Sequence, residues 1–346
     1  MNQPDTAPLN IYHALPKVEL HRHLEGSLRL TTMLDIARAH GLTVPAGVLS
    51  LSGMVQVQDE DPLTFNNFLE KFKTLRLFYR SPEVIDRVTR EAVEDAAKDN
   101  IRYLELRFTP VALSRAEGFP LHDVMDWVLG SSQVAAREFG IKVGLISSVN
   151  RHESPELAEQ VAWLAAQYVG KGLVGLDLAG NEAEFSALPF EGIFKEARQS
   201  GLRITIHAGE WGGAANVREA IEVFGAERIG HGVRVLEDDD VTALAVERKT
   251  AFEVCITSNY QSGVVPNLGG HPLASMLNEG LNATINTDDP SVSRITLSGE
   301  YHVACDELGI PLDVLKQCIL AAGQVAFQPD AERSKLVSDL KKELKL

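Results

Sequence analysis

The sequence has 346 residues, of which 45% are hydrophobic and 23% are charged, a balance typical of a soluble globular protein. The net charge of −15 argues against nucleic-acid binding, which needs a basic surface. Three scattered cysteines are too few for a disulfide framework or a cysteine-based zinc site. The amino terminus lacks a signal-like region and no apolar run of about 18 residues occurs, so we expect a cytoplasmic protein without membrane contact.

The chain alternates between short apolar runs and segments with helical spacing. A first run ends at His21 and His23, and seven more strands are predicted at 102–108, 141–149, 173–179, 202–207, 227–231, 251–256 and 281–287. Eight strands that alternate with helices indicate a parallel sheet, and this number favours a closed (β/α)8 TIM barrel. An open doubly wound sheet would need a glycine-rich phosphate loop after an early strand, and the sequence has none there. We therefore predict one α/β domain over residues 1–346.

An insertion at about 42–80 follows the first strand and its helix. Residues 42–61 are rich in Gly, Ser and Asp and are predicted as loop. Residues 62–79 have the spacing of an amphipathic helix that carries Phe65, Phe68 and Phe72. Two interpretations are open, namely ordinary core packing or an apolar lid over a site.

Polar residues recur at the predicted carboxyl ends of the strands, where such a barrel carries its active site. His21 and His23 share one face of the first strand because side chains alternate along a strand. Other strand ends contribute Asp177, His207 with Glu210, His231, and the pair Asp288 and Asp289. Imidazole and carboxylate ligands without thiolates suit Zn²⁺, with Fe²⁺ or Mn²⁺ as lesser options, and indicate a mononuclear metal hydrolase.

The residue types also suggest a division of roles. Zinc lowers the pKa of a coordinated water to about 7. Glu210 is the expected proton shuttle, and His231 is expected to orient the water or help to deprotonate it. Of Asp288 and Asp289, one is expected on the metal and the other on a substrate donor.

Taken together, the motifs resemble the adenosine/adenine deaminase family of the amidohydrolase superfamily. The matching segments are 19–27 (ELHRHLEGS), 177–182 (DLAGNE), 207–210 (HAGE), 228–233 (RIGHGV), 257–259 (TSN) and 286–290 (NTDDP). They run in family order from residue 18 to 290, so the resemblance covers nearly the whole chain.

The resemblance implies a site with one Zn²⁺ per chain, held by His21, His23, His207 and Asp288. It implies that Glu210, His231 and Asp288 are catalytic. A zinc-bound hydroxide, held by His231, would attack C6 of the purine while Glu210 protonates N1, and ammonia would leave. The residues implied around the substrate are Glu25, Gly180 (backbone to N3), Asp289 (to N7), Phe65 and Phe68 of the lid, and His23.

Two positions bear on the substrate. Gly230, before His231, is similar to the nucleoside branch, whereas the free-base branch would be expected to carry Asp there. Glu25 replaces the Asp that usually meets the ribose in adenosine deaminases, and its longer side chain intrudes on that end. The resemblance implies deamination of adenosine and 2′-deoxyadenosine to inosine and deoxyinosine. The alternatives are a modified adenosine such as aminodeoxyfutalosine, or adenine.

Two other classes of protein fit the sequence less well. A catalytically silent binding or signalling protein would have lost a ligand or the acid, but all are present. A general two-metal amidohydrolase for a cyclic amide or phosphotriester would favour a bridging Lys at a strand end, and the fourth and fifth strand motifs contain none. The expected partner is therefore a small-molecule purine nucleoside, and the sequence carries no indication of oligomeric state.

Overall fold

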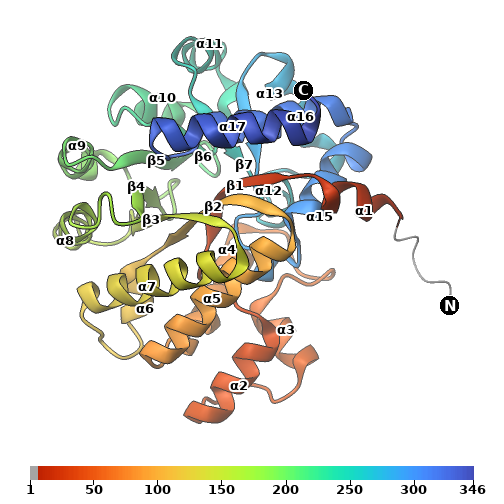
Figure 1. Ribbon diagram of the computed structural model, residues 1–346. Helices are drawn as coiled ribbons and strands as arrows, with labels where there is room; N and C mark the ends of the chain where they lie inside the picture. The colour runs from red at the N-terminus through yellow and green to blue at the C-terminus, as the bar shows by residue number, and fades with distance from the viewer. Residues whose placement is uncertain (1–6) are drawn as a thin grey trace.

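The computed structural model describes residues 7–346 and confirms the predicted barrel (Figure 1). Parallel strands follow one another in chain order around one eight-stranded sheet: β1 (Lys17–His23), β2 (Ile101–Phe108), β3 (Lys142–Asn150), β4 (Leu173–Ala179), β5 (Arg203–Ala208), β6 (Arg228–His231), β7 (Ala251–Val254) and β8 (Asn282–Ile285). Beyond β8 the chain meets β1 again, where the backbone N–H of Asp288 donates to the carbonyl of His21 at 2.9 Å. This contact nearly closes the barrel.

Helices lie between the strands and cover the outside of the barrel. The longer ones are α5 (Pro82–Lys98), α7 (Leu121–Phe139), α8 (Pro155–Ala166), α9 (Glu191–Gln199), α10 (Ala214–Glu222), α11 (Asp239–Arg248), α16 (Leu312–Val325) and α17 (Asp330–Leu344). Shorter helices are α1 (Ala7–Ala14), α6 (Pro110–Ser114), α12 (Ile256–Gln261), α13 (Leu273–Asn278), α14 (Pro290–Ser293) and α15 (Leu297–His302). Ser81 and Ser154 cap α5 and α8, because each side-chain oxygen accepts a backbone N–H group of the first turn and a proline follows at the first helical position.

The insertion between β1 and β2 is larger than predicted. It contains α2 (Leu30–His40), α3 (Val48–Val55) and α4 (Phe65–Leu75), and α2 and α3 project below the barrel in Figure 1. The prediction of loop over 42–61 is wrong for α3, because Leu51 and Val55 gain a buried face that the local Gly and Ser content does not reveal.

The inside of the barrel holds a charged layer below the site. The Arg228 side chain pairs with Glu105 and lies 2.6 Å from Glu253, and all three residues are fully buried. The Phe327 ring, in the connection between α16 and α17, lies 3.4 Å from the Arg228 guanidinium carbon. Because this connection packs at the amino-terminal ends of the strands, the opposite end carries the site.

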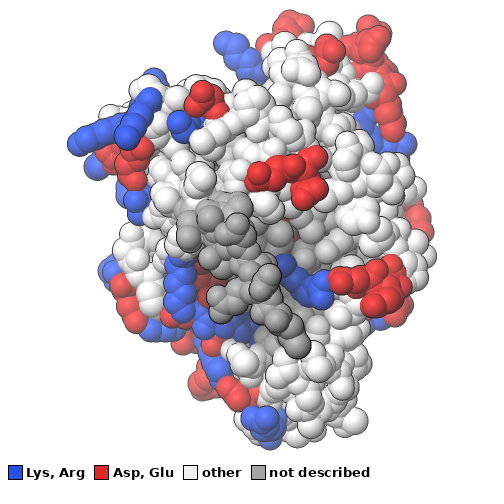
Figure 2. Space-filling view, turned by 90° about the vertical axis from the view of Figure 1, so that its right-hand side faces the viewer, with Lys and Arg blue, Asp and Glu red and all other residues white. Residues whose placement is uncertain are grey.

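The charged side chains on the surface are distributed as the net negative charge of the sequence predicts. On the face shown in Figure 2, Lys and Arg side chains lie among Asp and Glu side chains instead of forming one basic area. Among residues 7–346, none of the helices combines the length and apolar character that crossing a membrane requires.

Candidate active site

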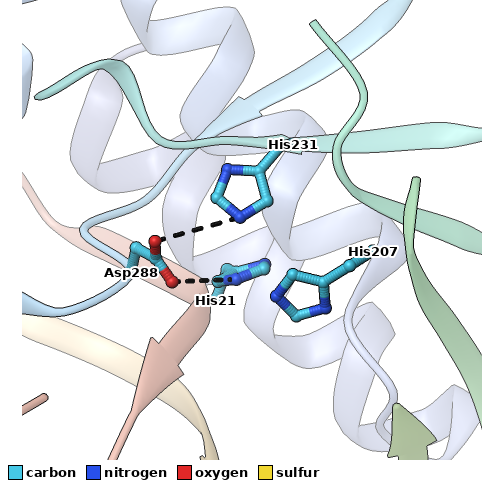
Figure 3. Close-up of side chains that lie close together, drawn as sticks. All are labelled: His21, His207, His231 and Asp288. Carbon is cyan, nitrogen blue, oxygen red and sulfur yellow. Dashed lines mark ion pairs between the residues drawn. The ribbon is translucent and has the colours of Figure 1, made fainter. Parts of the chain in front are cut away.

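A cluster of three imidazoles and one carboxylate lies at the carboxyl ends of the strands (Figure 3). The ligand atoms of His21, His207, His231 and Asp288 all lie within 4.8 Å of one another, and all four residues are buried. Asp288 Oδ1 is 3.2 Å from His21 Nε2, and Asp288 Oδ2 is 3.9 Å from His231 Nε2. His23 also reaches the cluster, because its Nε2 atom is 3.4 Å from both His207 Nε2 and Asp288 Oδ1. The structure thus brings together all four predicted ligands and His231.

Buried carboxylates determine which ring nitrogens face the centre of the cluster. His21 Nδ1 lies 2.8 Å from Glu253, and His207 Nδ1 lies 2.9 Å from Asp177. A carboxylate accepts the Nδ1 proton, so each Nε2 atom carries a free lone pair toward the other ligands. His21 Nε2 is buried and has no hydrogen-bond partner among the described residues. Two such nitrogens beside a carboxylate form a donor set that suits zinc.

Arg107 holds these two orienting carboxylates. Its guanidinium lies 2.7 Å from Glu253 and 3.3 Å from Asp177, and all three side chains are fully buried. Although burial opposes ionisation, Arg107 and Arg228 keep the pKa of Glu253 well below its usual range. The sequence analysis missed Glu253 and Arg107. Their signal was a charged residue inside an apolar strand, which requires a buried partner.

Glu210 follows β5 and lies beside His231, with 3.6 Å between Glu210 Oε2 and His231 Nε2. Burial, reinforced by Asp288 and Glu182, raises the pKa of Glu210 well above its usual range. A raised pKa favours the protonated form of the carboxyl group, which can then act as an acid.

Glu182 fixes the loop that carries this acid. Its carboxylate accepts the backbone N–H groups of Gly209, Glu210 and Trp211 at 3.0, 2.6 and 2.7 Å, and the side-chain amide of Asn216 at 2.9 Å. The sequence analysis quoted Glu182 within a motif but gave it no role.

Two site residues have a strained backbone. His231 and Asp288 have φ values of 59° and 63°, in the left-handed region that residues other than glycine rarely adopt. The Ser258 hydroxyl donates to Asp288 Oδ2 at 2.7 Å, and the backbone N–H of His23 donates to the Asp288 carbonyl at 2.8 Å. Such strain persists where surrounding contacts hold it, and it is common at active sites.

A cavity of about 420 Å³ opens above the cluster. Its lining includes every residue predicted around the substrate: His23, Glu25, Phe65, Phe68, Gly180 and Asp289. Phe65 and Phe68 belong to α4, so the lid interpretation agrees with the position of this helix over the cavity. The volume falls in the range of small-molecule sites.

Glu25 and Asp289 face this cavity with unpaired oxygens. Glu25 Oε1 accepts the backbone N–H of Thr109 at 2.6 Å, while Glu25 Oε2 and Asp289 Oδ1 are buried and have no partner among the described residues. Burial raises the pKa of Glu25 to about 7. Burial, together with Asp288 and Glu25, raises the pKa of Asp289 well above its usual range, so Asp289 can hold a proton and donate it.

A family model described as adenosine deaminase matches residues 16–343 of this chain. The chain belongs to the adenosine deaminase family. It is thus a hydrolase with the amidohydrolase type of barrel and metal-binding site. An adenosine deaminase from Erwinia tasmaniensis is 38% identical over 323 residues, which cover 92% of this chain and 96% of that protein.

Solved structures agree with this adenosine deaminase family fold. An adenine deaminase from Arthrobacter aurescens superposes with a TM-score of 0.88 at 26% identity, over 96% of this chain and 100% of that one. An amidohydrolase from Burkholderia ambifaria with bound Zn gives 0.87 at 26% identity, over 99% and 95%. An N6-mAMP deaminase from Arabidopsis gives 0.85 at 27% identity, over 96% and 99%.

Proposed function

We propose that the chain catalyses zinc-dependent hydrolytic deamination of adenosine and 2′-deoxyadenosine, which yields inosine or deoxyinosine and ammonia. The observation that carries the proposal is one arrangement in a single cavity. Two imidazole nitrogens oriented for a metal, the carboxyl group of Asp288, whose pKa is lowered, and that of Glu210, whose pKa is raised, face the same space. The adenosine deaminase relative supports this choice of reaction.

The residues that would hold the zinc ion are His21, His23, His207 and Asp288. Bound zinc supplies Lewis acidity, which makes water nucleophilic near neutral pH. Although burial opposes ionisation, the neighbouring His21 and His231 side chains keep the pKa of Asp288 well below its usual range. Asp288 therefore stays ionised and can accept a proton from the attacking water.

The other side chains act on the purine and on the water. Glu210 donates its proton to N1, which makes C6 electrophilic. His231 orients the water for attack at C6, because its Nε2 atom points between Glu210 and Asp288. Asp289 donates to N7, and the Gly180 backbone contacts N3. The proton that Asp288 accepted from the water passes to the 6-amino group, which leaves as ammonia, and the C6 hydroxyl proton returns to Glu210.

Glu25 and Gly230 bear on the choice of substrate. A Cβ atom on Gly230 would lie 3.0 Å from His21 and 3.2 Å from His207, so a larger residue there would disturb two ligands. Glu25 occupies the buried wall beside Asp289, where the ribose would be met. The modified adenosine and adenine alternatives rest on this longer carboxylate, and the Arthrobacter adenine deaminase shares the fold.

A second candidate is a 6-substituted adenosine monophosphate. Lys73 and Arg76 line the cavity together with the lid, and cations at this position suit a phosphate group. Arabidopsis relatives of this fold include an N6-mAMP deaminase and complexes with IMP and GMP.

A substrate panel tests the proposal. Zinc-loaded protein is assayed for release of ammonia or methylamine with adenosine, 2′-deoxyadenosine, adenine, aminodeoxyfutalosine, AMP and N6-methyl-AMP. Fastest turnover of the first two supports the proposal, and fastest turnover of N6-methyl-AMP favours the second candidate. Failure to deaminate any of the six by zinc-loaded protein would contradict both.

A variant then examines the role of Glu25. Glu25→Asp shortens the carboxylate and should shift preference toward plain adenosine over bulkier or base-only substrates. Glu184→Asp, at an exposed position on the same cavity, is the matched control. An unchanged preference in Glu25→Asp would remove Glu25 from the specificity argument.

A further inference from the structure

A chain of three buried hydrogen bonds runs from the rear of His231 to the backbone of Leu273. His231 Nδ1 lies 3.0 Å from the Asn259 side-chain nitrogen. The Asn259 side-chain oxygen lies 3.3 Å from His271 Nε2, and the backbone N–H of Leu273 donates to His271 Nδ1 at 3.2 Å. Asn259, His231 and His271 are all buried, so water cannot replace a wrongly directed bond.

The donor and acceptor roles along this chain of hydrogen bonds are fixed by the backbone N–H of Leu273. A backbone N–H can only donate, so His271 Nδ1 must be the acceptor. Neutral imidazole carries one proton, which must then be on Nε2 of His271. Burial lowers the pKa of His271 to about 3, in agreement with a neutral ring.

The proton on His271 Nε2 also fixes the donor and acceptor roles at Asn259 and His231. His271 Nε2–H donates to the Asn259 oxygen, which leaves the Asn259 amide nitrogen to donate to His231 Nδ1. His231 must then carry its proton on Nε2. The opposite arrangement would place two donors face to face in a buried position.

We propose that Asn259 and His271 are positioning residues that hold His231 in the Nε2–H tautomer, so that His231 donates a hydrogen bond to the catalytic water and stays off the metal. This inference rests on the proposed function and deepens it. Carboxylates behind His21 and His207 select the Nδ1–H tautomer, whereas an amide nitrogen behind His231 selects the reverse. The hydrogen-bond partner at Nδ1 thus distinguishes the ligands His21 and His207 from the donor His231, although all three rings belong to the same cluster.

Nitrogen NMR of the zinc-loaded, ¹⁵N-histidine-labelled protein tests the tautomer without an activity assay. The His231 signals, assigned from their loss in His231→Asn, should show a protonated Nε2 and a bare Nδ1. A proton on Nδ1, or a zinc-bound Nε2, would overturn the proposal. Because this readout needs no substrate, it separates failure of the tautomer proposal from failure of the proposed reaction.

Two variants of His271 test its role as a donor. His271→Gln keeps an N–H group at the position of Nε2, and His271→Met keeps a similar volume without a donor. His271→Gln should keep the wild-type tautomer of His231 and a kcat within about threefold of wild type. His271→Met should give a mixture of His231 tautomers and a kcat about 10- to 100-fold lower, with unchanged zinc content and little change in KM.

Equal losses of kcat in both variants, or an unchanged His231 tautomer in His271→Met, would show that His271 acts only through packing. If His271→Met does not fold, the wild-type spectrum still decides.

Discussion

At the scale of single residues, Glu210 is a buried carboxyl group whose surroundings favour the protonated form. Glu210→Gln keeps the shape but cannot donate a proton, so kcat should fall at least about 100-fold while zinc content stays the same. Glu184→Gln makes the same change at an exposed position of the cavity and should leave kcat close to wild type. Activity that survives in Glu210→Gln would refute the assigned acid.

Glu182 should matter because it positions Glu210. Glu182 Oε1 accepts the backbone N–H groups of Glu210 and Trp211, and Oε2 accepts the N–H groups of Gly209 and Asn216. In Glu182→Gln, an amide NH₂ group replaces one of these two oxygens and faces the two N–H groups that it accepted. An unmet buried hydrogen bond costs about 1–3 kcal/mol, which corresponds to a loss in kcat of about tenfold or more if the loop shifts. Steady-state kinetics should show this loss with little change in KM. A rise in KM alone would instead place Glu182 in substrate binding.

His271 gives a prediction for stability against pH. Its pKa of about 3 in the folded protein lies below the usual value of about 6.5, so only the unfolded chain binds the proton between these values. The stabilising contribution is therefore complete above pH 6.5 and is lost as pH falls toward 3. Between pH 7 and pH 5, the wild type should lose about 2 kcal/mol of unfolding free energy relative to His271→Gln, as measured by urea unfolding. Parallel curves would contradict the neutral buried ring.

The sequence identified the residues that face the cavity more readily than those behind them. His21, His207, Glu210 and Asp288 stand at strand ends in a shared pattern, which the alternation of strands and helices makes visible. Glu253 and Arg107 stand out in the sequence only as charged residues in apolar strands, and their pairing appears when strands β2, β4 and β7 meet inside the barrel. Tautomers likewise depend on partners that are distant in sequence, as between His231 and Asn259.

At the scale of elements, the lid helix α4 contacts the loop that carries Glu210. The Phe65 ring lies 4.0 Å, centroid to centroid, from the Trp211 ring, and Trp211 follows Glu210 directly. Phe65→Ala removes an aromatic pair worth about 0.5–1.5 kcal/mol, so KM should rise by about 3- to 10-fold with little change in kcat. Leu77→Ala, which alters an exposed side chain outside the cavity, is the control. A loss confined to kcat would contradict a binding role for α4.

Strands were easier to predict than the insertion. Buried parallel strands are continuous apolar runs bounded by turns, so the predicted 173–179 coincides with β4, while β7 and β8 end two residues earlier than predicted. Helix α3 escaped prediction because its stability comes from a short buried face and not from local helix propensity.

At the scale of the whole molecule, we propose that the chain forms one domain, as predicted for 1–346, of which residues 1–6 lie outside the described part. The two ends of the described chain join the same body, since Tyr12 donates to Asp306 at 2.7 Å and Arg102 at β2 pairs with Glu343 of α17 at 2.7 Å. The barrel thereby brings strand ends that are up to about 270 residues apart in sequence, such as His21 and Asp288, to within 3.2 Å.

The central claim is that a single metal ion at this cluster makes the chain a purine nucleoside deaminase. Zinc titration into metal-free protein, with adenosine turnover followed at each addition, tests it most directly. We predict that turnover rises in proportion to added zinc, stops at one ion per chain, and yields inosine and ammonia in equal amounts. Full turnover without metal, or a plateau at two ions per chain, would contradict the account.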